Sequence, residues 1–210
     1  IEEVIYKEDE WIPLGRAYQD TTQLPGIPMY GVTMVYGHPD SGKSTLALEA
    51  AKGAIDNDIL PIFINTEKKF NWGHALEMGI SQEDMLYVDS IEEVEDITKF
   101  VRDRLKDQRE GSLPTDILVI IDSIGNVVSK AEREAIEKEA DGAIMKTAKV
   151  LTQQIHRVIE KQISATKRAD FPYSASLLIV NHAYEGTIAN TLTPYGGKGI
   201  TKAASLIIRM

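Results

Sequence analysis

One octapeptide near the start of the chain restricts its possible folds more than any other feature. Residues 37–44 read GHPDSGKS, which matches the pattern G-x-x-x-x-G-K-[ST]. In this pattern the glycines let successive backbone N–H groups point at a polyphosphate, while Lys43 reaches the β- and γ-phosphates and the Ser44 hydroxyl binds Mg²⁺. The segment predicts a site for a nucleoside triphosphate, made by Gly37, His38, Pro39, Asp40, Ser41, Gly42, Lys43, Ser44 and the next residue, Thr45.

The flanks of this segment favour a phosphate loop over a plain glycine- and serine-containing turn. Residues 32–36 (VTMVY) read as a buried strand that enters the loop, and residues 45–52 (TLALEAAK) read as a helix that leaves it. The positive end of that helix dipole favours an anion at the loop.

The composition fits one globular domain of 210 residues, 43% of them hydrophobic and 26% charged. No apolar run approaches the roughly 20 residues that span a bilayer. No basic, apolar leader opens the chain, so we expect a cytoplasmic protein without a membrane partner. The lack of cysteine excludes disulfides and Cys-based zinc sites. A net charge of −9 argues against a strongly basic nucleic-acid-binding domain, although a local basic patch or a groove built by a filament is compatible with it.

Short apolar runs alternate with helical patterns along the chain, which predicts an α/β fold with a mainly parallel central sheet flanked by helices. One helix is expected to begin at Ser90, because Glu93 stands at the capping-box offset, and another covers residues 143–163. We expect one nucleotide-binding core over residues 26–210, after an irregular lead-in over residues 1–25. Its further strands are expected at residues 59–65, 85–88, 117–121, 177–180 and 205–208.

Two carboxylates follow predicted strands and are candidates for chemistry. Asp122 ends the most hydrophobic strand, where it can hold Mg²⁺ and its water shell, or cap a turn. Its neighbour Ser123 can hydrogen-bond a γ-phosphate or cap the next segment. Glu67 follows the strand at 59–65, where it can orient and deprotonate a water, or lie on the surface at a loop junction.

A third polar strand end lies near the C-terminus. Asn181 and His182 close the strand at 177–180, where they can sense a γ-phosphate or simply be satisfied polar residues. The glycine-rich end of the following segment, 183–201, is either a surface loop or a nucleic-acid contact. Trp72 and His74 can flank an adenine ring or pack within the protein.

Four motifs in this order resemble the core of RecA-type recombinases, and most closely the phage UvsX-like branch. They are residues 24–31 (LPGIPMYG) before the phosphate loop, 63–67 (FINTE), 120–126 (IIDSIGN) and 179–185 (IVNHAYE). The resemblance implies ATP and Mg²⁺ as cofactors, with Lys43 and Ser44 on phosphate and metal and Asp122 on the metal's water shell. Glu67 matches the catalytic glutamate of that family. His182 matches the strand-end position that couples the γ-phosphate to a DNA-binding loop, although bacterial members usually have Asn-Gln there.

The same resemblance implies two DNA-contacting loops. Residues 129–142 match the first, with Lys130 and Arg133 as phosphate contacts, although the glutamates of this segment also fit a solvated helix face. Residues 183–201 match the second, with Gly196, Gly197 and Lys198 as contacts.

The function that the resemblance implies is a DNA-dependent ATPase. It would assemble as a homo-oligomeric filament on single-stranded DNA, with ATP between subunits, and promote homologous pairing and strand exchange in recombination and repair. Two alternatives stay open. One is a hexameric helicase motor of the same fold, for which Arg209 is the only nearby arginine finger, and the other is an ATP-binding recombination mediator that forms no filament.

Overall fold

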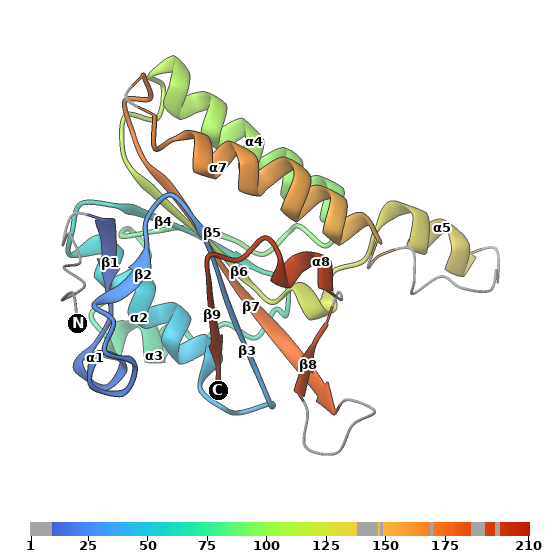
Figure 1. Ribbon diagram of the computed structural model, residues 1–210, viewed down its shortest axis with the longest axis horizontal. Coiled ribbons are helices and arrows are strands. Elements are labelled where there is room, and N and C mark those ends of the chain that lie inside the picture. Colours follow the sequence, from blue (N-terminus) through green and yellow to red (C-terminus); the bar gives the residue numbers. More distant parts are fainter. Residues whose placement is uncertain (1–9, 138–146, 148, 169, 186–191, 196–197) are drawn as a thin grey trace, which may run out of the picture.

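A computed structural model describes residues 10–137, 147, 149–168, 170–185, 192–195 and 198–210. Strands and helices alternate through this part of the chain (Figure 1). The elements are β1 (Trp11–Pro13), α1 (Arg16–Thr22), β2 (Gly26–Pro28), β3 (Val32–Gly37), α2 (Lys43–Ile55), β4 (Leu60–Asn65), α3 (Trp72–Glu77), β5 (Leu86–Val88), α4 (Val94–Glu110), β6 (Ile117–Asp122), the short 3₁₀ helix η2 (Ile124–Asn126), α5 (Lys130–Glu137), the π-helical η3 (Thr152–Ile159), α7 (Glu160–Ala165), β7 (Ala175–Glu185), β8 (Leu192–Pro194), α8 (Lys198–Thr201) and β9 (Leu206–Arg209).

The central sheet has the strand order β5-β4-β6-β7-β3-β9, and each of these neighbouring pairs is parallel. The short strand β8 joins it by pairing antiparallel with β7. The predicted α/β fold with a mainly parallel sheet is therefore confirmed. The six predicted strands all occur as short apolar runs, and those in the middle of the sheet, such as β4 and β6, are buried on both faces.

Alternate residues of the strands feed two separate hydrophobic cores. In β6, Ile117, Val119 and Ile121 pack with α4, η3 and α7, whereas Leu118 and Ile120 pack on the opposite face with α2. Figure 1 shows the long pair α4 and α7 along one face and the group of α1, α2 and α3 on the other. The sheet is thus covered on both sides, and its strand ends are the edges left for a site.

Part of the lead-in differs from the irregular segment predicted for residues 1–25. β1 pairs antiparallel with β2 and is followed by α1, and Ile12, Leu14 and Tyr18 are buried in the core on the α2 side. Gly53 of α2 permits this packing, since a Cβ there would overlap the carbonyl oxygen of Pro13. The short strand was not recognised because it holds too few residues to show a period.

The predicted start of α4 at Ser90 is wrong. The helix begins at Val94 with Glu93 as the residue before it, and Ser90 lies outside the helix. The preceding backbone pairs with a distant segment instead, because Val94 donates to the carbonyl of Val128 and Val128 donates to that of Glu92. This tertiary pairing outweighs the local capping signal.

The helix predicted for residues 143–163 is found in part, as η3 and α7, while 143–146 and 148 lie outside the described residues. Within the ranges that the structure describes, no helix combines the length and the apolar composition needed to cross a membrane.

Candidate nucleotide site

The strand order brings the three predicted strand ends to the phosphate loop. β7 lies between β3, which enters the loop, and β6, which ends in Asp122. In register, Gly37 of β3 stands beside His182 of β7, and Asp122 of β6 stands beside Asn65, two residues before Glu67. Side chains that are far apart in sequence therefore meet at the carboxyl edge of one sheet, the edge where open α/β sheets bind ligands.

A cleft of about 610 Å³ occupies this edge. Its volume falls in the range of small-molecule sites. Most of the predicted site residues line the cleft, and the lining includes two cations and three carboxylates. The lining residues are Pro39, Asp40, Gly42, Lys43, Ser44, Thr45, Glu67, Lys69, Asp122, Asn126, Val180 and His182.

The phosphate loop has the backbone that its sequence predicts. Gly42 has a φ of 90°, in the left-handed region that favours glycine, and α2 begins directly after it at Lys43. The Lys43 ammonium is buried and donates to the carbonyl oxygen of His38 at 2.5 Å, with Ser41 Oγ at 3.5 Å. Burial lowers the pKa of Lys43, although the nearby carboxylates of Asp122 and Glu67 oppose this shift.

Asp122 is the buried carboxylate of the cleft, at 8% exposure. Burial raises its pKa above the ordinary value, against the opposing hydrogen bond with Ser44 and the attraction of Lys43. Carboxylate and hydroxyl oxygens are the hard ligands that Mg²⁺ prefers, and this pair lies next to the loop that would hold the phosphates. The residues present therefore fit a magnesium ion shared with a triphosphate.

Replacing Asp122 with asparagine is expected to stabilise the nucleotide-free protein while it weakens Mg²⁺-dependent ATP binding. Because the folded-state pKa is raised, the ionised carboxylate costs stability at neutral pH, and this cost disappears as the pH falls below the unfolded value of about 3.9. The melting temperature should be higher than that of the parent protein at pH 7, and the gain should shrink in acid. Thermal unfolding from pH 7 to pH 4 measures it. The exposed Asp103→Asn is the control, and an equal gain in that variant would contradict the assignment.

Three polar groups form a closed hydrogen-bonded set at the rim of the cleft. The Ser123 hydroxyl donates to Glu67 Oε1 at 2.7 Å, and His182 Nε2 lies 2.6 Å from the same oxygen and 3.1 Å from Ser123 Oγ. Burial alone would raise the pKa of Glu67, but the hydrogen bonds from Ser123 and His182 hold it below the ordinary value. Glu67 is therefore an ionised, oriented carboxylate, as a base for water must be.

Thr66 and Gly125 hold this set in place. The Ser123 backbone N–H donates to Thr66 Oγ1 at 3.0 Å, and Thr66 Oγ1 donates back to the Ser123 carbonyl. Gly125 lies directly against the imidazole, because a Cβ there would overlap Cδ2 of His182. Thr66 and the two residues that follow Asp122 in its motif, Ser123 and Gly125, thus position His182.

Replacing Gly125 with alanine is expected to displace His182 from Glu67 and Ser123. We expect a loss of about 1–3 kcal/mol of unfolding free energy from overpacking, and ATP turnover lower than in the parent protein with ATP binding retained. Chemical denaturation and a steady-state ATPase assay measure the two effects. Gly15→Ala is the control, since the first atom its Cβ meets is the flexible carboxylate of Glu49 at 3.3 Å. Unchanged turnover in Gly125→Ala would show that the imidazole position does not matter.

The other member of the strand-end pair faces away from the cleft. The Asn181 side chain is buried and donates to the carbonyl of Tyr195 at 2.9 Å, and the Tyr195 backbone N–H donates to the carbonyl of His182 at 3.0 Å. The end of β7 is thereby tied to the far end of the 183–201 segment.

Trp72 and His74, the two candidates for stacking on a base, have different surroundings in the structure. Trp72 packs edge-on against Phe70 and Tyr87, with ring centroids 4.7 and 5.2 Å away. His74 instead lines a smaller cavity of about 110 Å³ that also contacts Thr45 and Asn71. Trp72 is thus part of an aromatic cluster, and His74 is the one that remains open to a ligand.

The two predicted DNA contacts of segment 129–142, Lys130 and Arg133, do not line the cleft. Lys130 and Arg133 stand on α5 and form ion pairs with acidic residues at the start of α4: Lys130 with Asp96 at 2.9 Å and Arg133 with Glu93 at 3.0 Å. Residues 130–137 form the helix α5 rather than an open loop. Gly196 and Gly197 lie outside the described residues, and Lys198 is described only by its backbone, at the start of α8.

The sequence reasoning missed three residues of the site. Lys69 and Asn126 line the cleft, and Gly125 packs on His182. Lys69 could have been found from its position two residues after Glu67. The contact of Gly125 with His182 joins residues 57 positions apart and has no local signal.

A phosphate loop, a magnesium-type carboxylate and an oriented glutamate around one cleft define a nucleotide-binding protein of the P-loop class. The family model of the RecA N-terminal domain matches residues 10–171. The chain belongs to that family.

Individual relatives agree with the family model. The chain is 30% identical to protein RecA of Geobacter metallireducens over 150 residues, which cover 70% of this chain and 41% of that protein. It is 26% identical to protein RecA of Aquifex aeolicus over 195 residues, which cover 91% of this chain and 52% of that protein. The chain therefore spans about half the length of the curated relatives that it matches, or less.

Proposed function

We propose that this chain is the ATPase core of a recombinase that acts on single-stranded DNA. The observation that carries the proposal is the set of Glu67, Ser123 and His182, because it joins a candidate catalytic carboxylate to a strand end that leads out of the cleft. Membership in the RecA N-terminal domain family supports the same function.

Each residue of the cleft has its own role in the proposed hydrolysis of ATP. Glu67 orients the attacking water and accepts its proton, and Lys43 neutralises charge on the terminal phosphates. Ser44 and Asp122 would hold Mg²⁺, which when bound neutralises charge that develops between the β- and γ-phosphates. His74, with Thr45 and Asn71 beside it, would contact the base.

The link to DNA would run through the end of β7. A γ-phosphate near Glu67 would shift the hydrogen bonds of His182, and the neighbouring Asn181 holds Tyr195 at the end of the 183–201 segment. We propose that this segment, with Gly196, Gly197 and Lys198, contacts single-stranded DNA, and that residues 129–142 form a second contact. Lys130 and Arg133 would have to exchange the carboxylates of α4 for DNA phosphates.

We further propose a homo-oligomeric filament with ATP between subunits, homologous pairing and strand exchange as its activity, and a place near the phage UvsX-like branch. The motif residues that support this branch are Asp122-Ser123 and Asn181-His182.

An ATPase assay with and without single-stranded DNA, together with electron microscopy of the complex, tests the proposal. Hydrolysis that DNA stimulates, accompanied by helical filaments, supports a recombinase. Closed rings would indicate the hexameric motor instead, and neither turnover nor assembly would indicate a mediator.

A further inference from the structure

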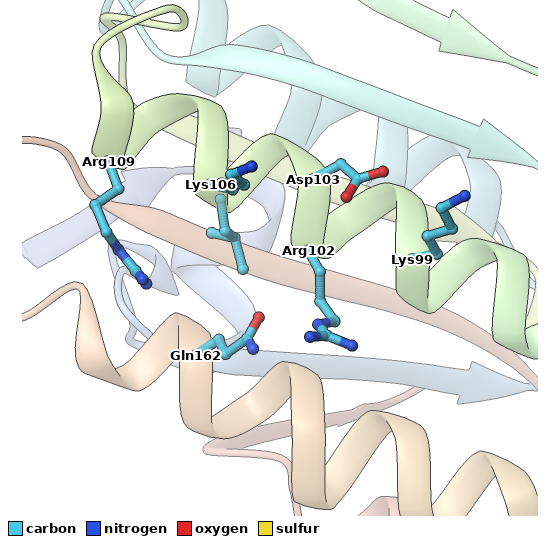
Figure 2. Close-up of a pocket in the computed structure, with 7 residues that line it drawn as sticks. Lys99, Arg102, Asp103, Lys106, Arg109 and Gln162 are labelled. Atoms are coloured by element: carbon cyan, nitrogen blue, oxygen red, sulfur yellow. The ribbon is translucent and has the colours of Figure 1, made fainter.

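A row of cations on α4 is not used by the nucleotide site. Lys99, Arg102, Lys106 and Arg109 are exposed and follow one another at spacings of three, four and three residues, so they share one face of the helix. With Gln162 of α7 they line a cavity of about 310 Å³, which we call the α4 groove (Figure 2). The groove shares no lining residue with the ATP cleft.

The basic surface continues past the end of α4. A second cavity of about 390 Å³ is lined by Arg109 and Arg168 together with one carboxylate, Asp170, so the two cavities share one guanidinium. Arg109 is held in place by Phe171, whose ring centroid lies 5.0 Å from its guanidinium carbon. This preorganised cation joins the two hollows into one surface.

These cations are largely free to bind a ligand. Within the described ranges, Lys99, Arg102, Arg109 and Arg168 form no ion pair, and Lys106 reaches only Glu110, at 3.6 Å. Asp103 is the carboxylate in the lining, and Figure 2 shows it pointing away from Gln162, while Arg102 and Arg109 reach toward the α7 side. Unpaired cations are unexpected on a chain with a net charge of −9.

We propose that the α4 groove binds the phosphate backbone of a nucleic acid. From Lys99 to Arg109 the helix rises about 15 Å, at about 1.5 Å per residue. That span covers between four and five phosphate intervals of one DNA strand, at about 3.4 Å each, so the row is long enough to contact several consecutive phosphates. The surface therefore provides a further nucleic-acid contact, separate from segments 129–142 and 183–201, on the face of the sheet that α4 and α7 cover.

The lining favours a polyphosphate over an acidic protein segment. Protein interfaces depend on apolar or aromatic anchors that enter pockets. In the α4 groove the apolar lining residue is Leu105, which is buried in the core, and the rest of the lining is charged or polar. Such a surface contacts phosphates as point charges and carries no sequence preference.

The test is binding of fluorescently labelled DNA, single-stranded and duplex, to the purified chain without ATP, measured by anisotropy across KCl concentrations. In the variant Arg102→Gln/Lys106→Gln/Arg109→Gln we expect affinity to fall about tenfold or more at 100 mM KCl. The slope of log K against log[KCl] should become shallower by about 2 for single strands and about 3 for duplex. Comparing the single-stranded and duplex measurements shows which form of DNA the groove binds.

A control variant, Arg16→Gln/Lys52→Gln/Lys202→Gln, removes the same number of charges outside both cavities. Equal weakening in the control would assign the effect to net charge and overturn the proposal, as would unchanged affinity and slope in the groove variant. Binding of an acidic peptide but not of DNA would also overturn it. If the triple variant melts at a lower temperature, Arg102→Gln alone, which breaks no ion pair within the described ranges, is expected to lower the slope by about 1.

ATP binding, measured with a fluorescent ATP analogue, should be equal in the parent chain and the groove variant. This readout separates the groove from the proposed ATPase. If the parent chain binds no ATP, the proposed ATPase fails, but a loss of DNA binding in the groove variant would still support the groove.

Discussion

Replacing Lys43 with alanine is expected to weaken ATP binding by about 10- to 150-fold, the range for loss of hydrogen bonds to a charged group. The ammonium belongs to the first residue of α2, is buried and faces the carbonyl of His38, inside the phosphate loop itself. Turnover should fall further, since the same cation stabilises charge that develops on the transferred phosphate. Calorimetric titration with MgATP and a steady-state ATPase assay measure the two losses.

Lys52→Ala is the matched control for this variant. Lys52 lies on the same helix, α2, but it forms an exposed ion pair with Asp56 and does not line the cleft. If Lys43→Ala binds MgATP as tightly as the parent protein, the phosphate loop is not the nucleotide site and the proposed function fails with it.

Replacing Glu67 with glutamine is expected to reduce ATP turnover by about 10²- to 10⁴-fold while ATP binding is kept, because general-base catalysis contributes a factor of that size. Glutamine preserves a carbonyl oxygen that can accept from Ser123 and His182, so the geometry should survive while the negative charge is lost. The parent carboxylate has a lowered pKa and is ionised at every pH above about 4.3, so protonation of Glu67 should not limit turnover between pH 6 and 8.

Glu77→Gln serves as the control, since the side chain of Glu77 is 82% exposed and its carboxylate lies 3.8 Å from His74 Nδ1. A Glu67→Gln variant with unchanged turnover would remove the catalytic role and leave Glu67 as a structural partner of His182.

Much of the fold follows from local patterns in the sequence. The central strands β4, β6 and β7 are apolar runs with polar residues at their carboxyl ends, and the phosphate loop requires a glycine at position 42, where φ is positive. The first residue of α4 and the N-terminal strand β1 were harder to predict from the sequence. Ser90 carries a capping signal, but pairing of the 92–94 backbone with Val128 decides where α4 begins. A local signal of this size is easily outweighed by tertiary hydrogen bonds.

The site residues at the carboxyl ends of the strands were predicted from the sequence, whereas the contacts that hold them in place were not. Asp122, Glu67 and His182 could be named because each follows an apolar run, and the carboxyl ends of parallel strands share one edge. The contacts that fix them, from Thr66 to Ser123 and from Gly125 to His182, join residues more than 50 positions apart. No pattern within one segment records such a contact.

The sequence by itself determined the phosphate loop, the family of motifs and the parallel sheet, because these depend on residue types at short, fixed spacings. The tertiary packing of α5 against the start of α4, which no local pattern records, pairs Lys130 and Arg133 with carboxylates. In the α4 groove, by contrast, Lys99, Arg102 and Arg109 form no ion pair with a described residue. The sequence specifies which side chains are charged. Whether another side chain neutralises such a charge depends on which helices the fold packs together, since an ion pair acts only over a few ångströms.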